Sequence, residues 1–369
     1  MLKGGTEYQT LYLARALMGE GFDVKVLCYH ESDMEVVNEF QTTGAEVDLL
    51  NWPRKTNKLH LISDFIRYFR KEKPWAVHVQ YIAPAATVIL SAKLAGIKNI
   101  LATLHQMGTQ YGMKDRMLMR FSSSLCRRFT FVSLAVQESW TGKRHLYDPG
   151  QPASFLSAKG TIYNTVDADE ILGIRELADK PGLVNLWGLK GKIVVGAVSR
   201  LRYEKGIDVL VRAFVLIQPE IPDARLFIVG DGPERKSLEN LAERLGISNS
   251  IIWTGEVTRS TAIQLMSVMS LMVLPSRYEG FGLTAIEAMI QGIPVVASKT
   301  GGIEEVVGSV DYDSLFKTED HEDLAKVILD FLRMHKENWN ATAVIEMTKN
   351  LFNFPVYSKT IAMLYNSLI

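Results

Sequence analysis

Cysteine and long apolar runs are both scarce in this chain. Its 369 residues contain two cysteines, Cys28 and Cys126, which lie far apart and form no Cys-x-x-Cys pair. This spacing indicates neither a disulfide framework nor a zinc site. The longest apolar stretches, Ile82 to Leu90 and Leu271 to Pro275, are well short of the ~20 residues that span a bilayer. The sequence therefore predicts two reduced thiols and no transmembrane helix.

A signal sequence and a net charge are also lacking. The first residues, Met-Leu-Lys-Gly-Gly, do not have the basic, apolar and small-residue succession of a signal peptide, so we expect a cytoplasmic protein. The 41 Lys and Arg residues balance 41 Asp and Glu residues, which argues against general binding of nucleic acid. The balance is uneven, because residues 51–150 contain 16 Lys and Arg against 5 Asp and Glu. This basic segment predicts either a solvated helix surface or a surface that meets anionic lipid or an anionic acceptor.

The chain does have a regular alternation of short apolar runs and longer helical patterns. The runs are rich in β-branched residues, which is typical of parallel sheets with helices on both faces. A first series predicts strands at 23–29, 45–49, 75–80, 99–104, 129–133 and 160–163. A second series predicts strands at 193–198, 225–229, 251–254, 271–274 and 294–297, and helices at about 206–218, 233–246, 260–268, 284–291 and 320–335.

The restart of this alternation after residues 181–192 indicates a domain boundary. We predict an α/β chain with two doubly wound, Rossmann-like domains, residues 1–180 and 181–350, and a terminal segment, 351–369. A hydrophobic fraction of 47% is enough to build two cores. Open parallel sheets bind ligands at the carboxyl ends of their strands, so we expect the ligand there.

A glycine-containing loop directly follows the apolar run at 271–274. Gly280 and Gly282 let the backbone approach a ligand closely, and Thr284 opens a helix whose unpaired N–H groups favour a phosphate. Glu287 lies one turn inside this helix, where a carboxylate also has an ordinary capping role. The succession of strand, loop and helix predicts a diphosphate site without the lysine of a P-loop. The motif is Arg277-Tyr278-Glu279-Gly280-Phe281-Gly282-Leu283-Thr284-Ala285-Ile286-Glu287-Ala288.

This motif resembles that of the retaining family-4 glycosyltransferases, which carry two glutamates separated by seven residues. Glu279 and Glu287 have this spacing. A second segment, residues 199–206, resembles the family pattern Gly-Arg-Leu-x-x-x-Lys-Gly, with Ser199 in place of the first glycine. The resemblance covers nearly the whole chain and includes Gly4-Gly5-Thr6-Glu7, Thr103-Leu104-His105, Ile162-Tyr163-Asn164-Thr165-Val166-Asp167, Ser199-Arg200-Leu201-Arg202-Tyr203-Glu204-Lys205-Gly206, Val229-Gly230-Asp231-Gly232-Pro233, Trp253-Thr254-Gly255 and Gly301-Gly302-Ile303-Glu304-Glu305. It implies the GT-B fold, in which two Rossmann-like domains face each other across a cleft and a C-terminal helix crosses back to the first domain.

The resemblance also implies roles for charged side chains. Arg200 and Lys205 would bind the pyrophosphate of a nucleotide sugar, and Glu287 would accept hydrogen bonds from both ribose hydroxyls. Glu279 would sit beside the transferred sugar. His105 would hydrogen-bond that sugar and stabilise the reacting centre. Each residue also has a purely structural alternative. Arg200 and Lys205 would be exposed loop cations, Glu287 would be a structural residue of its helix, and His105 would be a core histidine.

Backbone groups would complete the implied donor pocket. The amides of Phe281, Gly282 and Leu283 would surround the sugar and phosphates, together with Thr284 at the helix start. Two further groups of glycines would approach the same phosphates, namely Gly301 and Gly302 from the second domain and Gly5 from the first.

The mechanism that the resemblance implies is retention by same-face displacement. The departing diphosphate helps to deprotonate the attacking hydroxyl, and catalysis depends on positioning and electrostatic stabilisation. No cofactor and no metal ion is expected in this mechanism. Two Asp-x-Asp triplets, Asp167-Ala168-Asp169 and Asp311-Tyr312-Asp313, are not expected to bind metal.

The sequence predicts an enzyme that moves a sugar from a nucleotide-diphosphate sugar to a hydroxyl acceptor, which can be a glycan, a lipid-linked molecule or a small molecule. An epimerase or hydrolase that acts on a nucleotide sugar is one alternative. A catalytically silent protein that binds a nucleotide sugar is another. The motifs do not specify the donor base, the sugar or the acceptor.

Residues 111–128 mix apolar and basic side chains. Met113, Met117, Leu118 and Phe121 alternate with Lys114, Arg116 and Arg120, which is compatible with an interfacial helix on anionic lipid. This segment would place the protein peripherally at the inner membrane face. The alternative is an ordinary amphipathic helix whose apolar side packs on the first sheet.

Two further expectations concern the ends of the chain. Residues 356–368 resemble the family's terminal helix and should pack on the first domain. At the other end, Gly4-Gly5 should follow the first, central strand of a doubly wound sheet, yet Met1-Leu2-Lys3 is too short to form one. We therefore expect that about ten residues are missing, that the strands at 23–29 and 75–80 are not paired, and that the apolar faces of the flanking helices are exposed.

Overall fold

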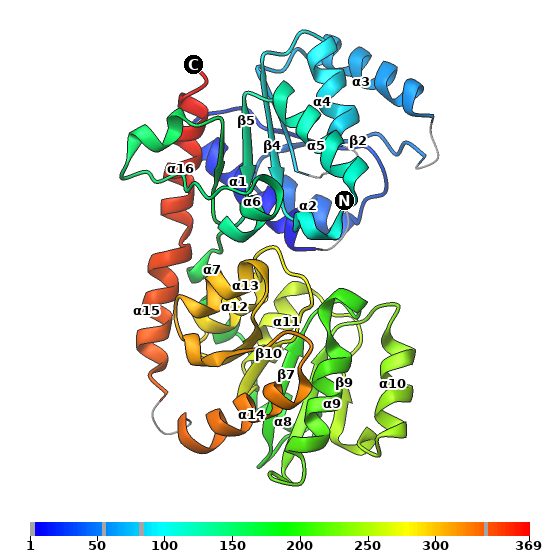
Figure 1. Cartoon of the computed structure of the whole chain (residues 1–369), viewed down its shortest axis with the longest axis vertical. Coiled ribbons are helices and arrows are strands. Elements are labelled where there is room, and N and C mark those ends of the chain that lie inside the picture. The colour runs from blue at the N-terminus through cyan, green and yellow to red at the C-terminus, as the bar shows by residue number, and fades with distance from the viewer. Residues whose placement is uncertain (1–3, 54–56, 81–84, 336–338) are drawn as a thin grey trace. The chain divides into compact units, whose positions relative to one another are not determined.

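The computed structural model describes the whole chain except residues 1–3, 54–56, 81–84 and 336–338. The chain forms two compact units (Figure 1). Unit 1 comprises residues 1–165 and 354–369, and unit 2 comprises residues 166–353. Each unit is built from parallel β-sheet with helices packed around it, so the predicted α/β class is confirmed.

Unit 2 contains one parallel sheet of six strands. The strand order is β12-β11-β10-β7-β8-β9, which is a doubly wound order with the switch point between β7 and β10. The five predicted strands are all present, and β12 is an addition whose two residues are too few for a periodic pattern. The bounds are β7 Ile193–Val198, β8 Ala224–Val229, β9 Ile251–Trp253, β10 Leu271–Leu274, β11 Val295–Ser298 and β12 Leu315–Phe316.

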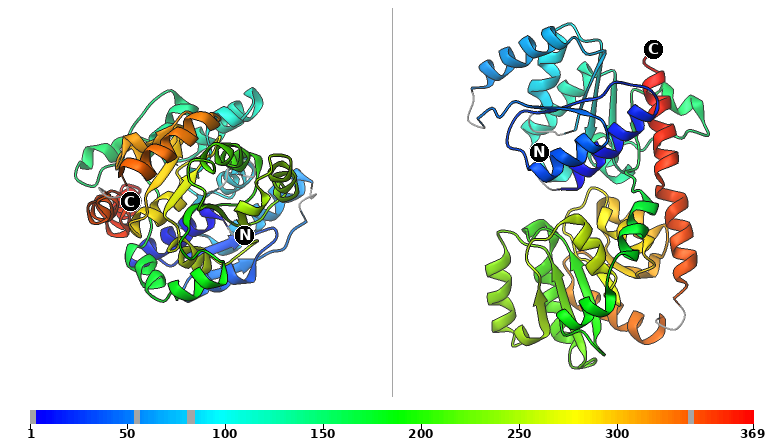
Figure 2. Two further views of the ribbon diagram at one scale, coloured as in Figure 1. Left: turned by 90° about the horizontal axis from the view of Figure 1, so that it is seen from below. Right: turned by 180° about the vertical axis from the view of Figure 1, so that it is seen from behind.

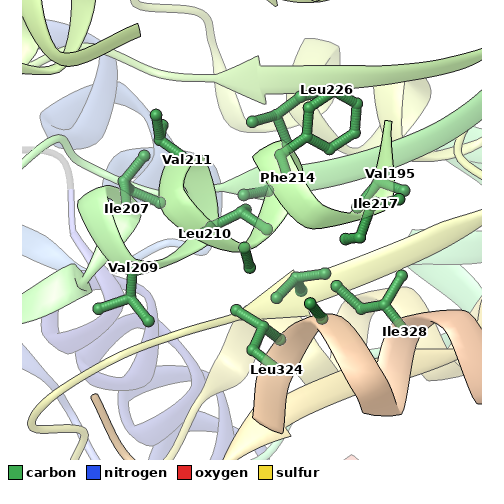
Figure 3. Packing of buried hydrophobic residues seen from close by; sticks show 14 of the residues in the cluster. Val195, Ile207, Val209, Leu210, Val211, Phe214, Ile217, Leu226, Leu324 and Ile328 are labelled. Carbon is green, nitrogen blue, oxygen red and sulfur yellow. The ribbon is translucent and has the colours of Figure 1, made fainter. Parts of the chain in front are cut away.

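Nine helices of the described part of unit 2 surround this sheet. α9 is buried on most of its circumference, because α14 and α10 both pack against it. Figure 3 shows Leu210 and Phe214 of α9 beside Leu324 and Ile328 of α14 in one apolar cluster. The bounds are α7 Ala168–Glu176, α8 Lys180–Leu186, α9 Ile207–Ile217, α10 Arg235–Arg244, α11 Arg259–Met266, α12 Leu283–Ile290, α13 Gly301–Gly308, α14 His321–Asp330 and α15 Ala341–Phe352.

The division of the chain differs from the expected boundaries at 180/181 and 350/351. Asp167 caps α7 by accepting a hydrogen bond from the amide of Glu170, and α7 packs on α11 and α12. α15 packs on α12 as well. These contacts make residues from 166 onward part of unit 2 and move its end to residue 353.

Unit 1 contains two parallel sheets. β1 pairs with β2, while β3, β4, β5 and β6 pair in that order. In the described residues β1 is not hydrogen-bonded to β3, as expected, and residues 1–3 lie outside the described part of the chain. The bounds are β1 Lys25–Cys28, β2 Glu46–Leu49, β3 Ala76–Val79, β4 Asn99–Leu104, β5 Arg128–Phe131 and β6 Lys159–Thr161.

The last helix, α16 (Phe354–Asn366), belongs to unit 1 and packs along α1 (Gly5–Gly19), as predicted (Figure 2). Leu13 and Leu17 of α1 and Ile361 and Leu364 of α16 share one core cluster. The expectation that the apolar face of α1 is exposed is therefore wrong, because α16 and α2 cover it. The remaining helices of unit 1 are α2 Met34–Thr42, α3 Lys58–Glu72, α4 Ala85–Leu94, α5 Met113–Leu125 and α6 Leu134–Thr141.

In the described ranges, no helix combines the length and the apolar character that crossing a bilayer requires.

Candidate functional site

A small pocket lies at the switch point of the unit 2 sheet. The carboxyl ends of β7 and β10 form two of its walls, because neighbouring parallel strands end at the same edge. Lys205 enters from the turn before α9, and Thr284 enters from the first turn of α12. The lining residues are Ala197, Val198, Ser199, Lys205, Ile207, Val273, Leu274, Pro275, Ser276, Glu279 and Thr284.

Two predicted site residues meet in this pocket. The ammonium of Lys205 donates a hydrogen bond to Oε2 of Glu279 over 2.6 Å. Ser276 donates to the same carboxylate oxygen over 3.4 Å. The side chains of Lys205 and Glu279 are 27% and 19% exposed, so the pair is only partly screened by solvent. This contact joins two loops that are far apart in the sequence.

The loop before α12 presents unpaired backbone N–H groups. No side chain caps α12, and its first turn contains no acidic residue. The amides of Gly282, Leu283 and Thr284 have no acceptor in the described part of the chain. Three N–H groups at the positive end of a helix are suited to an anion such as a phosphate.

One predicted amide is already used, since Gly302 donates its N–H to the carbonyl of Glu279 over 3.1 Å. In this structure the amide of Gly302 is therefore occupied by a backbone carbonyl, and its expected role as a phosphate donor stays a prediction. A Cβ at Gly302 would lie 2.1 Å from the carbonyl oxygen of Gly280, so this glycine allows the start of α13 to pack on the loop. Gly301, with φ +53°, begins α13, and its amide has no acceptor in the described residues. The side chain of Phe281 is buried and its ring packs edge-on against Phe352, so only its backbone can contribute to the pocket.

Glu287 lies on the buried side of α12. Its Oε1 accepts a hydrogen bond from Nε of Arg259 over 3.0 Å, and Arg259 also contacts Glu170 of α7 over 2.5 Å. Burial raises the pKa of the Glu287 carboxyl, while the charge and the hydrogen bond of Arg259 oppose this shift. Arg259 is not predictable from the sequence, because no local pattern links it to a residue on another helix.

Arg277 connects the loop before α12 to the turn before α9. It forms a bidentate pair with Asp208 of α9, with both N–O distances 2.8 Å, and contacts Glu319 over 2.7 Å. It also donates to the carbonyl of Tyr203 over 2.8 Å and lies 4.2 Å from the centre of that ring. The hydrogen bond with Asp208 raises the pKa of Arg277, so its charge is permanent. Arg277 thereby holds the turn that carries Lys205 against the loop that carries Glu279.

Two residues directly after β7 differ in their environment. Arg200 is exposed, its side chain forms no hydrogen bond or ion pair among the described residues, and it is not one of the residues that line the pocket. The hydroxyl of Ser199 is buried in the pocket wall without a hydrogen-bond partner. In the sequence, Ser199 stands where the family pattern has a glycine. This replacement places a hydroxyl at a position where the family pattern has no side chain.

The remaining predicted site residues lie in unit 1. His105 follows β4, and its Nε2 lies 3.0 Å from Oε1 of Gln80 at the end of β3. Burial lowers the pKa of His105 to about 4, so the ring is neutral near pH 7. Among the residues that the structure describes, the buried amide nitrogen of Gln80 has no hydrogen-bond partner. Gly5 is the first residue of α1, and none of the described side chains caps this helix.

A second histidine lies behind His105 on the neighbouring strand. Nε2 of His78 lies 2.7 Å from the hydroxyl of Thr103, and Nδ1 lies 2.9 Å from the hydroxyl of Tyr365 on α16. Burial lowers the pKa of His78 to about 3, and His105 contributes to the shift. This neutral, hydrogen-bonded ring links the sheet to the terminal helix.

The two Asp-x-Asp triplets have structural roles. Asp167 caps α7, and Asp311 accepts hydrogen bonds from the amide of Asp313 and the hydroxyl of Ser314. Among the residues that the structure describes, no three His, Cys, Asp or Glu side chains come together as a metal site.

Comparison with known proteins finds a match to a glycosyltransferase family model in each half of the chain. The family model described as "Glycosyltransferase Family 4" matches residues 3–149, and the model described as "Glycosyl transferases group 1" matches residues 187–343. An uncharacterized glycosyltransferase of Methanocaldococcus jannaschii is 42% identical over 30% of this chain and 28% of its own length.

Two relatives match over longer segments. N-acetyl-alpha-D-glucosaminyl L-malate synthase of Bacillus anthracis is 28% identical over 74% of this chain and 70% of its own length. The lipopolysaccharide core biosynthesis mannosyltransferase LpsB of Rhizobium meliloti is 31% identical over 60% of this chain and 64% of its own length. The matches thus span less than a third of the archaeal relative and about two thirds of the two bacterial ones.

Solved structures agree on the fold. HepE of Anabaena in complex with UDP-glucose has a TM-score of 0.82 at 20% identity, with 99% of this chain and 97% of that chain covered. Sucrose-phosphate synthase of Thermosynechococcus elongatus has a TM-score of 0.76 at 20% identity, with 99% and 94% covered. With the paired glutamates at 279 and 287 and a match to a family model in each half, this chain belongs to the family-4 glycosyltransferases (glycosyl transferases group 1) and has the GT-B fold.

Proposed function

We propose that this protein is a retaining glycosyltransferase that moves a sugar from a nucleoside-diphosphate sugar to a hydroxyl acceptor. The observation that carries the proposal is the pocket at the β7/β10 switch point, where Lys205 lies near the unpaired amides at the start of α12. A cation beside a helix N-terminus favours a pyrophosphate. Glu287, inside the same helix, offers a carboxylate to the ribose hydroxyls of a nucleotide.

In the proposed reaction the acceptor oxygen forms a bond to the anomeric carbon on the face from which the diphosphate departs. The bond between that carbon and the diphosphate oxygen breaks, and the diphosphate takes the proton of the acceptor hydroxyl. Lys205, Arg200 and the amides of α12 stabilise the charge that develops on the diphosphate. The contact of Glu279 with Lys205 favours an electrostatic role for this carboxylate over that of a covalent nucleophile.

His105 is proposed to hydrogen-bond the transferred sugar. Its low pKa keeps the ring neutral, so one ring nitrogen can accept a hydrogen bond while the other donates one. Gly5, at the start of α1, is proposed to approach the phosphates with its backbone. No divalent cation is proposed, because Lys205 and Arg200 supply positive charge for the leaving group.

The donor and the acceptor remain open in this proposal. HepE was solved with UDP and UDP-glucose, so UDP sugars are a reasonable first set of donors. The two longer-matching relatives are named for different sugars and acceptors, so neither activity is assigned to this chain. The acceptor can be a glycan, a lipid-linked molecule or a small molecule.

The experiment that tests this proposal starts with a thermal-shift screen of nucleotide sugars. A donor at 100 times its dissociation constant stabilises the protein by ~2.7 kcal/mol. Turnover of the donors found is then measured with and without candidate acceptors, and in the presence of EDTA. We expect acceptor-dependent release of nucleotide and a product of unchanged anomeric configuration.

Other outcomes identify the alternatives. Release of free sugar without an acceptor would identify a hydrolase, and an isomerised nucleotide sugar would identify an epimerase. Tight binding without any turnover would identify a silent nucleotide-sugar-binding protein. An inverted anomeric configuration, or loss of activity in EDTA, would contradict the proposed mechanism.

A further inference from the structure

The helix α5 of unit 1 has an unusual distribution of side chains. Its buried residues are Met119, Ser122 and Ser123, whereas four large apolar residues point to solvent. A helix that packs on a sheet normally does so with its large apolar side chains and leaves its polar ones in water. The exposed residues, which we call the α5 stripe, are Met113 (79% exposed), Met117 (66%), Leu118 (46%) and Phe121 (54%).

The α5 stripe lies along one side of the helix. Met113, Met117 and Phe121 follow one another at a spacing of four residues, and Leu118 lies beside this row. Ser122 and Ser123 use their hydroxyls inside unit 1, where they donate to carbonyls of α5, and Ser123 also accepts from Lys159. The buried side of α5 thus combines Met119 with two serines, and Lys159 binds one of them, whereas most of the large apolar side chains of this helix lie on the exposed side.

The start of α5 is well anchored. The amide of Gly108 donates to the hydroxyl of Ser139 over 2.8 Å, and Nε1 of Trp140 donates to the carbonyl of Gln106 over 2.8 Å. The guanidinium of Arg116 donates to the carbonyl of Ser139. The bonds of Gln106 and Gly108 fix the segment that leads into α5, and the bond of Arg116 fixes the first turn of α5 against α6.

Basic side chains accompany the stripe. Lys114 lies within it, one turn before Leu118, and Arg120 lies at its border; both are exposed. Asp115 is the one acidic residue of this helix. Lysine is depleted from the cores of protein interfaces, whereas at a bilayer surface it keeps its charge among the headgroups while its methylenes lie against apolar chains. The position of Lys114 therefore favours a lipid surface over a protein partner.

We propose that the α5 stripe, with Lys114 and Arg120, is a docking surface for an anionic lipid bilayer. The helix would lie in the plane of the interface, with its apolar side chains at the boundary between headgroups and acyl chains and its cations at anionic headgroups. This surface is distinct from the pocket in unit 2. It begins at Met113, eight residues after His105, which follows β4.

The test is co-sedimentation of the full chain with phosphatidylcholine vesicles that either contain or lack phosphatidylglycerol. We expect the wild type to bind the anionic vesicles and to bind them more weakly at high salt. The triple variant Met113→Gln, Met117→Gln, Phe121→Gln should bind roughly tenfold more weakly or worse. The double variant Lys114→Gln, Arg120→Gln should lose about fivefold per cation on anionic vesicles.

Matched controls come from unit 2. Leu177→Gln with Leu186→Gln removes two apolar side chains that are 80% and 72% exposed, and Lys236→Gln with Arg244→Gln removes two exposed cations of α10. Both controls should bind as the wild type does. Circular dichroism checks that every variant is folded, which we expect because all the changed side chains are exposed.

Three results would overturn the proposal. They are equal, negligible binding of the wild type to both kinds of vesicle, unchanged binding by the triple variant, and a soluble dimer of the wild type that the triple variant does not form. Vesicle binding is measured without donor, so it is independent of the proposed transfer reaction. Conversely, turnover with a water-soluble acceptor should be unchanged in the triple variant.

Discussion

The ammonium of Lys205 lies 2.6 Å from Oε2 of Glu279, although the two residues are on separate loops of unit 2. A pyrophosphate bound by Lys205 would therefore share this ammonium with a carboxylate. The arrangement places positive charge for the leaving group directly beside a negative charge that can stabilise a developing oxocarbenium ion. The proposed chemistry depends on this pair more than on any other contact in the described part of unit 2.

Removing the charge of Lys205 should impair catalysis without unfolding unit 2. We expect Lys205→Ala to lower turnover roughly 30- to 1000-fold, which corresponds to ~2–4 kcal/mol of lost interaction. The control Lys236→Ala removes an exposed lysine from α10 and should be neutral. Donor turnover and the thermal midpoint are measured for both. Near-wild-type turnover in Lys205→Ala would show that the pocket is assigned wrongly.

Glu287 should matter for donor binding, and its protonation should be visible in the pH dependence. Glu287→Ala should weaken donor binding by ~2–4 kcal/mol, while Glu243→Ala, at an exposed site, should not. Because burial raises the pKa of Glu287, its carboxylate is protonated at a higher pH than an ordinary glutamate. Donor affinity should therefore fall as the pH is lowered into this raised range. Calorimetric titration at several pH values measures it, and a pH-independent affinity would contradict the role.

Arg277 is proposed as a positioning residue. Arg277→Lys removes the bidentate contact with Asp208, so we expect a loss of about 1–3 kcal/mol in stability and a fall in turnover, with a smaller change in KM. The control Arg333→Lys alters an exposed ion pair with Glu220 and should cost no more than ~1 kcal/mol. Urea unfolding and steady-state kinetics separate these effects. A purely structural Arg277 would lower stability and leave the kinetics of the folded enzyme unchanged.

Ser199 provides a hydroxyl that the family pattern lacks. Since this hydroxyl has no hydrogen-bond partner in the described part of the chain, Ser199→Ala should leave stability unchanged or raise it slightly. If the hydroxyl donates to a donor phosphate, the same change should weaken donor binding about 2- to 10-fold, as for one hydrogen bond. Thermal midpoints with and without donor test both parts. Equal stabilisation of the wild type and the variant by donor would exclude the contact.

The stability of unit 1 should fall in acid because of its neutral histidines. The folded-state pKa of His78 is about 3, below the value of about 6.5 in an unfolded chain. The unfolded state therefore binds more protons between these values, and the contribution is fully present above pH ~6.5 and lost as the pH falls toward 3. We expect His78 to account for a loss of roughly 2 kcal/mol by pH 5.

The variant His78→Gln tests this expectation, because it cannot titrate in this range. Its free energy of unfolding should depend less steeply on pH than that of the wild type. His60→Gln changes an exposed histidine of α3 and should leave the slope as it is. Identical slopes for His78→Gln and the wild type would show that His78 is not the group responsible.

Much of the fold could be predicted from local patterns. The strands at 99–104, 193–198 and 271–274 match the structure at both ends, because long runs of buried apolar residues stand between clear turn signals. β12 could not be predicted, since two residues carry no periodicity. The start of unit 2 was placed too late, because the packing of α7 on α11 and α12 is a contact between segments distant in sequence.

By itself, the sequence determined the α/β class, the two parallel series of strands, the position of the glycine loop after β10 and the spacing of Glu279 and Glu287. These features depend on neighbouring residues in the chain, through apolar periodicity and the conformations that glycine allows. Only the tertiary structure decided which distant residues pair, namely Lys205 with Glu279 and Arg259 with Glu287. It also decided that the amide of Gly302 donates to a backbone carbonyl. Finally, it decided that Met113, Met117 and Phe121 face solvent. Such relationships arise when distant segments pack, and packing selects which side of a helix is buried by the fit of all its neighbours together.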